Sequence, residues 1–249
     1  TAKVEFDHVD FSYKKDSKEP VLKDINLSIR AGETIGIIGG TGSGKSSVVN
    51  LIPRFYDVTE GQVMVDGMDV REYKITDLRD KIGIVPQKAV LFAGTVRSNL
   101  AWGKEDATEE EMQQALSVAQ AAEVVDKKDG KLDAEVEQGG KNFSGGQKQR
   151  LTIARALVKQ PEILIMDDSS SALDYATDAK LRQAIHNMPN RPTVFIVSQR
   201  AASIMYADKI IVLDDGTVAG TGTHEELLKD CSVYQEIYYS QFKRTEGGH

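Results

Sequence analysis

Polar and apolar residues alternate through much of the stretch from 4 to 85, which is typical of β-strands. One alternating segment covers residues 4–11 and a second covers residues 22–29. A turn signal at Arg30-Ala31-Gly32 then leads into a shorter, mostly apolar run over 33–38. We therefore expect the first part of the chain to be rich in strands.

The pattern becomes helical from about residue 88 to residue 158. Thr108-Glu109-Glu110-Glu111 is a capping-box signature, and apolar residues follow it at helical spacing. Strands that alternate with helices indicate a parallel sheet, and such an alternation follows this block. There we predict strands over 163–166, 193–197 and 209–213, helices over 175–188 and 233–242, and a short capped helix after Thr223.

A glycine-rich octapeptide stands between the apolar run at 33–38 and a helical pattern at 45–52. It reads Gly39-Gly40-Thr41-Gly42-Ser43-Gly44-Lys45-Ser46, a full match to the phosphate-loop pattern GxxxxGK[ST] in the strand-to-helix context that such a loop requires. Glycines let backbone N–H groups close on an anion, and the helix that follows directs its positive dipole end to the same point. We expect Lys45 to bridge the outer phosphates and the Ser46 hydroxyl to hold Mg²⁺.

A second feature fits a nucleotide and a metal ion. Ile163-Leu164-Ile165-Met166-Asp167 is an apolar strand that ends in a carboxylate, and Asp167 at the carboxyl end of a strand can reach Mg²⁺ through a water. Many strands end in Asp, so this feature is informative only beside the phosphate loop. Together they predict a P-loop NTPase with ATP and Mg²⁺ as its ligands.

A third motif, Phe143-Ser144-Gly145-Gly146-Gln147, precedes a helical segment at 148–157. Ser144 and Gln147 fit a capping box, which makes Ser144 the expected N-cap. The two glycines permit close approach of a ligand, and the helix N-terminus favours an anion. The alternative interpretation of this motif alone is a plain helix cap.

With these three motifs in order, nearly the whole chain resembles the nucleotide-binding domain of an ABC transporter. The resemblance implies that the loop at Ser144, Gly145, Gly146 and Gln147 acts in trans, on the γ-phosphate that a partner domain holds. It also implies that Tyr13 stacks on adenine, that Gln87 reports the nucleotide state to membrane domains, and that Ser171, Ala172, Leu173 and Asp174 form a loop at the dimer interface. Residues 90–100 and 135–136 resemble the exporter branch. Taken alone, Tyr13 is a half-exposed strand residue and Gln87 a surface glutamine.

The site that the resemblance implies has three parts. The expected catalytic residues are Asp168, Gln199 and Lys45, and the expected metal ligands are Ser46, Gln87 and Asp167. The expected nucleotide-binding residues are Tyr13, Gly39, Gly40, Thr41, Gly42, Ser43, Gly44, Lys45, Ser46, Ser47 and Gln87.

Two positions depart from the family pattern. The family usually has Glu after the strand-ending Asp, where this chain has Asp168, and it has a switch histidine where this chain has Gln199. Asp is one methylene shorter than Glu, so its carboxylate retreats by about 1.5 Å if the backbone stays in place. Such a displacement can cost about 100-fold in rate, and losing a positioned base costs roughly 10²- to 10⁴-fold. Gln199 can donate a hydrogen bond but carries no charge near pH 7.

This pair of changes resembles the degenerate-site half of heterodimeric bacterial ABC exporters, many of them drug-related. The expected partner is then a different half-transporter, and the intact loop at Ser144 would complete its competent site. Two alternatives remain: an ordinary homodimeric exporter domain with full ATPase activity, and a soluble ABC protein not involved in transport. Asp168 and Gln199 disfavour the first, and the short spacing from Gly39 to Asp167 leaves no room for the long insertion of some soluble relatives.

We expect an α/β fold in which a P-loop NTPase core with a mixed or parallel sheet is flanked by helices. The core, with an antiparallel β subdomain, is expected over 1–87 and 159–249, and an inserted α-helical subdomain over 88–158. The net charge of −7 and the absence of basic blocks argue against a nucleic-acid partner. The lone Cys231 excludes an internal disulfide.

The longest apolar runs are too short to span a bilayer, so we expect this segment to be soluble. We expect membrane domains to precede Thr1 in the parent polypeptide, and the segment to lie at the cytoplasmic face of the cell membrane.

Overall fold

The computed structural model describes residues 2–168 and 172–242 and divides into two compact units. The first unit combines Thr1–Arg79 with Thr193–His249, and the second is Asp80–Pro192. The cores of both units consist of the aliphatic residues whose pattern predicts the strands and helices. The predicted α/β class is confirmed by this mixture of sheets and helices.

The first unit contains an antiparallel sheet in the order β2-β1-β4-β5. The central strand β1 pairs with β2 on one side and with β4 on the other, and Phe6 and Phe11 are buried in its core-facing row. This is the antiparallel sheet that the alternating pattern predicts. Its strands are β1 (Val4–Phe11), β2 (Leu22–Ile29), β4 (Glu60–Val65) and β5 (Met68–Asp69).

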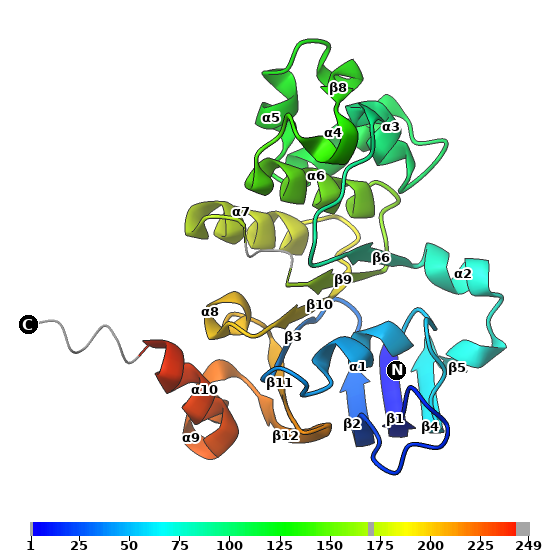
Figure 1. Cartoon of the computed structure of the whole chain (residues 1–249), viewed down its shortest axis with the longest axis vertical. Coiled ribbons are helices and arrows are strands. Elements are labelled where there is room, and N and C mark those ends of the chain that lie inside the picture. The colour runs from blue at the N-terminus through cyan, green and yellow to red at the C-terminus, as the bar shows by residue number, and fades with distance from the viewer. Residues whose placement is uncertain (1, 169–171, 243–249) are drawn as a thin grey trace, which may run out of the picture. The chain divides into compact units, whose positions relative to one another are not determined.

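The same unit contains the strands β12-β11-β3-β10 in that order, and they determine the position of the phosphate loop (Figure 1). β3 pairs in parallel with both β10 and β11, whereas β12 is an antiparallel edge strand. Strands buried on both faces read as continuous apolar runs, which is why β3 and β10 lack alternation. The bounds are β3 (Thr34–Ile38), β10 (Thr193–Ser198), β11 (Lys209–Asp214) and β12 (Thr217–Gly222), with α1 (Lys45–Leu51), α8 (Ala201–Ile204), η1 (Val70–Glu72) and α2 (Ile75–Asp80) elsewhere in the unit.

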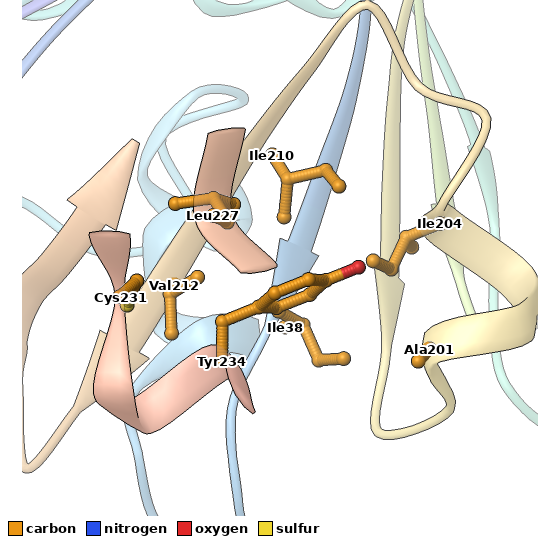
Figure 2. Packing of buried hydrophobic residues seen from close by; sticks show 8 residues of the cluster. All are labelled: Ile38, Ala201, Ile204, Ile210, Val212, Leu227, Cys231 and Tyr234. Atoms are coloured by element: carbon orange, nitrogen blue, oxygen red, sulfur yellow. The ribbon is translucent and has the colours of Figure 1, made fainter. Parts of the chain in front are cut away.

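Two C-terminal helices, α9 (His224–Asp230) and α10 (Ser232–Phe242), pack on β11 and α8 through a cluster centred on Tyr234. Figure 2 shows the Tyr234 ring among side chains that come from β3, β11, α8 and α9, including Ile38, Ile204 and Leu227. The Tyr234 hydroxyl and the His224 ring form a hydrogen bond. Burial raises the pKa of Tyr234 to about 12 and lowers the pKa of His224, so both side chains are neutral at pH 7.

The second unit contains the parallel pair β6 (Ile82–Val85) and β9 (Ile163–Asp167), together with the helices α3 to α7. Its longest helix, α6, buries Leu151, Ile153 and Leu157. The remaining elements are α3 (Val96–Ala101), α4 (Glu109–Val118), α5 (Ala122–Asp126), α6 (Gly145–Leu157), α7 (Tyr175–His186), the short strands β7 (Gly94–Thr95) and β8 (Glu135–Val136), η2 (Lys131–Asp133) and η3 (Gln138–Gly140).

Most predicted elements are confirmed, and the capping signals mark their starts. Thr108 and Ser144 are N-caps with complete capping boxes, and Thr223 caps α9. Several details differ: the block at 88–158 also contains the ribbon of β7 and β8, α7 ends at His186 rather than at residue 188, and the apolar pattern predicts none of α2, α8 and β12. The predicted limits of the helical subdomain, 88–158, stay a prediction.

Within the described residues, 2–168 and 172–242, no helix combines the length and the apolar character that a membrane span needs.

We expect Tyr234→Ala to lower the free energy of unfolding by about 3–5 kcal/mol, because it leaves a cavity where the ring packs. Tyr234→Phe keeps the ring and removes only the partner of His224, so it should cost about 1 kcal/mol. Urea denaturation measures both. The control is Tyr239→Ala on the exposed side of α10, where the ring is 50% exposed. Equal losses for Tyr234→Ala and Tyr239→Ala would show that the cluster does not anchor α10.

Candidate nucleotide-binding site

The phosphate loop joins the end of β3 to the start of α1, as predicted. Gly44 has a φ of 97°, a left-handed conformation that side-chain-bearing residues rarely adopt. It occupies the N-cap of α1 and provides no side-chain hydrogen bond to the first turn. Gly39 is required for another reason: a Cβ there would lie 2.4 Å from Ser43 Oγ and 2.6 Å from the Leu213 carbonyl oxygen. The loop therefore presents backbone rather than side chains, which suits an anion.

Hydrogen bonds within the protein hold the loop in this shape. Ser43 N–H donates to the Gly40 carbonyl at 3.1 Å, and Gly216 N–H donates to the Ser43 carbonyl at 3.0 Å. Gly216 belongs to the turn between β11 and β12, where its own carbonyl accepts from Lys23 N–H at 2.8 Å. Sequence analysis does not identify Gly216, although the Asp-Gly pair at 215–216 is a recognisable turn signal.

Lys45 and Ser46 lie in the first turn of α1, where the phosphate-loop pattern predicts them. The Lys45 ammonium donates to the Gly40 carbonyl at 3.3 Å, so it folds back over the loop. Among the described residues no three His, Cys, Asp or Glu side chains form a cluster that could hold a metal by themselves. The predicted ligands Ser46, Gln87 and Asp167 are instead one hydroxyl, one amide and one carboxylate. Such a mixed set of oxygens suits Mg²⁺, which takes its other ligands from water and phosphate.

Tyr13, the predicted adenine platform, is fixed by two contacts. Its hydroxyl lies 2.7 Å from Ser47 Oγ on α1, and its ring meets Tyr56 edge-on, with centroids 5.0 Å apart at 87°. The side chain is still 54% exposed, so a flat base could cover it. The structure thus brings Tyr13 and Ser47 together, and the stacking role stays a prediction.

Gln199 lies beside the phosphate loop because of strand register. In the parallel pair of β10 and β3, Ser198 lies opposite Ile38, so the residues that follow both strands leave the sheet at the same edge. The Gln199 amide nitrogen is 3.5 Å from Thr41 Oγ1, at the limit of a hydrogen bond. The predicted switch residue and the predicted phosphate loop are therefore neighbours.

In the second unit, the predicted metal and catalytic residues follow two parallel strands. Val85 at the end of β6 lies opposite Met166 near the end of β9, so Gln87, Asp167 and Asp168 leave this pair at its carboxyl edge. Asp168 has a φ of 48°, in the left-handed region, where Asp and Asn are the side-chain-bearing residues most often found.

The motif Ser144-Gly145-Gly146-Gln147, here called the signature loop, forms the N-terminus of α6. Ser144 Oγ accepts from Gln147 N–H at 3.2 Å, and the Gln147 side chain accepts from Ser144 N–H at 3.0 Å. The Ser144 hydroxyl proton remains available as a donor. Gly146 passes close to the predicted dimer loop, since a Cβ on it would be 3.1 Å from the Ala172 carbonyl oxygen. The signature loop and the Ala172 backbone are therefore packed together.

The predicted dimer loop is held by two side chains. Gln149, a buried residue of α6, accepts from Ala172 N–H at 3.0 Å, a contact that sequence reasoning missed. Asp174 is the N-cap of α7 and accepts from Thr177 N–H, and this hydrogen bond holds the pKa of Asp174 below its usual value. Leu173 lies between Ala172 and Asp174 in the sequence, and Ser171 lies outside the described residues.

Comparisons with known proteins identify the family. The family model described as ABC transporter matches residues 22–171. An uncharacterized ABC transporter ATP-binding protein of Mycobacterium tuberculosis is 51% identical over 92% of this chain and 40% of its own length. A Staphylococcus aureus protein whose name describes a multidrug export ATP-binding/permease protein is 42% identical over 96% of this chain and 41% of its own.

A solved structure shows the same fold. The structure of a bacterial Atm1-family ABC exporter with ATP bound superimposes with a TM-score of 0.89 at 37% identity, covering 96% of this chain and 42% of that one. This chain thus spans about two fifths of the length of the relatives that it matches. It belongs to the ABC transporter family, as an ATP-binding domain of the exporter type.

Proposed function

We propose that this chain is the motor domain of an ABC exporter, which binds Mg-ATP and pairs with a second nucleotide-binding domain to drive export. We further propose that its own hydrolytic position is degenerate and that its partner is a different half-transporter. The observation that carries the proposal is the phosphate loop with Gln199, rather than a histidine, at its edge. Membrane domains that precede this segment in the same polypeptide would hold it at the cytoplasmic face of the membrane.

Nucleotide binding follows from the chemistry of the phosphate loop. The N–H groups at the start of α1 would donate to the outer phosphates, and Lys45 would exchange the Gly40 carbonyl for phosphate oxygens. Tyr13 supplies an aromatic face for adenine. Ser46, Gln87 and Asp167 would hold Mg²⁺, which neutralises charge on the outer phosphates when it is bound.

Slow hydrolysis follows from two side chains. Asp168 carries a carboxylate one methylene shorter than the family's Glu, so it lies farther from an attacking water. Gln199 would donate a neutral hydrogen bond toward the terminal phosphate, a role supported by its position beside Thr41 of the phosphate loop. It can neither take up a proton nor stabilise developing charge as an imidazolium would. ATP then binds here and persists.

The signature loop gives this chain its contribution to a partner's site. The Ser144 hydroxyl and the N–H groups at the start of α6 point out of a helix N-terminus, a combination that favours a phosphate. Gln149 ties the Ala172 backbone to the same helix, so the signature loop and the dimer loop are presented as one surface. In a closed, partly dry interface each such donor is worth roughly 10²- to 10³-fold in rate.

Replacing Lys45 tests nucleotide binding. We expect Lys45→Ala to weaken Mg-ATP binding by roughly 10- to 100-fold or more, because a charge-assisted hydrogen bond to phosphate contributes about 1.5–3 kcal/mol. Calorimetric titration measures the dissociation constant. Lys229→Ala on the exposed side of α9 is the matched control and should bind normally. Unchanged ATP affinity in Lys45→Ala would contradict the proposed site.

Restoring the family residues tests the degenerate position. We expect Asp168→Glu with Gln199→His to raise hydrolysis at this site by about 10²-fold or more, and by more than the two single effects combined, since both groups act on one water and one γ-phosphate. The measurement is phosphate release from the complete two-chain transporter, with the partner's phosphate-loop lysine replaced. If the double variant folds, binds ATP and hydrolyses no faster, carboxylate length and the switch residue do not limit this site.

Blocking the signature loop tests action in trans. We expect Ser144→Arg to abolish ATP hydrolysis by the two-chain transporter, because its side chain fills the space that a γ-phosphate needs. Ser144→Ala removes the cap at a cost of about 1 kcal/mol and leaves that space open, so it should keep measurable activity. ATPase rates and melting temperatures are compared for both. Full activity in Ser144→Arg would rule out a role of this loop at the partner's nucleotide.

A further inference from the structure

The backbone next to the switch residue is held by a side chain from the C-terminal helix. Gln241, near the end of α10, accepts from Ala201 N–H at 2.8 Å and donates to the Gln199 carbonyl at 2.7 Å. A single side-chain amide therefore forms hydrogen bonds with the backbone on both sides of Arg200. Both distances are those of well-formed hydrogen bonds.

These two bonds take the place of a missing helix cap. Arg200 is the N-cap residue of α8 and makes no side-chain capping bond, so the first N–H of that helix needs another acceptor. Gln241 supplies this acceptor. The helix α8 has only four residues and so forms few hydrogen bonds of its own. The Arg200 N–H in turn donates to Ser198 Oγ at 3.0 Å. Gln241 and Ser198 together fix the backbone from the end of β10 to the start of α8.

The packing of α10 against its neighbours fixes the position of Gln241. Tyr234, on the same helix, is fully buried in the cluster that includes Ala201 and Ile204 of α8 (Figure 2). Gln235 donates to the carbonyl of Leu228 at 2.7 Å and so ties α10 to α9. The position of Gln241 is therefore determined by packing several residues away, which is what a positioning residue requires.

We propose that Gln241 is a positioning residue for the switch glutamine, and that through it α10 controls how the nucleotide site distinguishes ATP from ADP. This inference rests on the proposed function. The Gln199 side chain extends from the segment that Gln241 holds. Its amide nitrogen lies 3.5 Å from Thr41 Oγ1 in the phosphate loop. A small displacement of the Gln199 backbone moves its amide away from the terminal phosphate, the group that ATP has and ADP lacks. The β-phosphate, held by the loop N–H groups and Lys45, is not affected.

The test compares nucleotide discrimination in variants of this chain. Gln241→Leu removes both bonds at nearly constant size, and Gln241→Glu keeps the acceptor for Ala201 but sets an oxygen against the Gln199 carbonyl. We expect both to weaken Mg-ATP binding about fivefold while Mg-ADP binding stays within twofold, which is the effect of one misplaced hydrogen bond. Gln235→Leu is the matched control: it removes a glutamine bond from the same helix, and the ratio of ATP to ADP affinity should not change.

A double-mutant cycle separates positioning from general loosening. In a Gln199→Ala background, Gln241→Leu should leave the ATP to ADP affinity ratio unchanged, because Gln241 acts only through Gln199. An unchanged ratio in the Gln241 variants, or an equal shift with and without Gln199, overturns the inference while leaving the proposed function intact. Failure of the unaltered chain to bind ATP overturns the proposed function, and this inference with it.

Discussion

The parallel pairing of β3 with β10 and β11 is the constraint on which the nucleotide site depends. Its register sets Ile38 opposite both Ser198 and Val212, so the phosphate loop, the switch segment and the β11–β12 turn all leave the sheet at one edge. No side chain of the site has to reach far, because the backbones have already converged. Hydrogen bonds from Gly216 and Gln241 then fix the backbone conformation at that edge.

The local sequence predicts much of this arrangement. Apolar runs without alternation mark β3, β9 and β10, and capping residues such as Ser144 mark helix starts to the residue. What the sequence cannot reveal is which distant glutamine meets which backbone. Gln149 and Gln241 look like ordinary helix-surface residues, and their partners are fixed only when tertiary packing brings loops 23 and 40 residues away into reach. Such contacts depend on where the folded chain places each residue, and no local sequence pattern marks them.

In the proposed function, the site would combine strong features for holding ATP with weak ones for splitting it. Phosphate recognition would rely on backbone N–H groups, which most side-chain changes leave in place, and on the single side chain of Lys45. Bond cleavage would rely on the placement of single groups such as Asp168 and Gln199, where one methylene or one proton can change the rate. The two functions can therefore diverge by substitution at two positions without disturbing the fold. A domain with these properties would suit long occupancy by ATP, with hydrolysis left to the proposed partner.

The bonds from Ser43 to Gly40 and from Gly216 to Ser43 have a kinetic consequence. Since the loop's curvature comes from the protein's own hydrogen bonds, an arriving triphosphate meets a receptor that is already shaped and has little backbone entropy left to lose. Capture should then proceed in a single step at a rate set by diffusion and orientation, without a slower rearrangement after encounter. In the proposed function, conformational change would then be reserved for a later event, the pairing of two ATP-loaded domains.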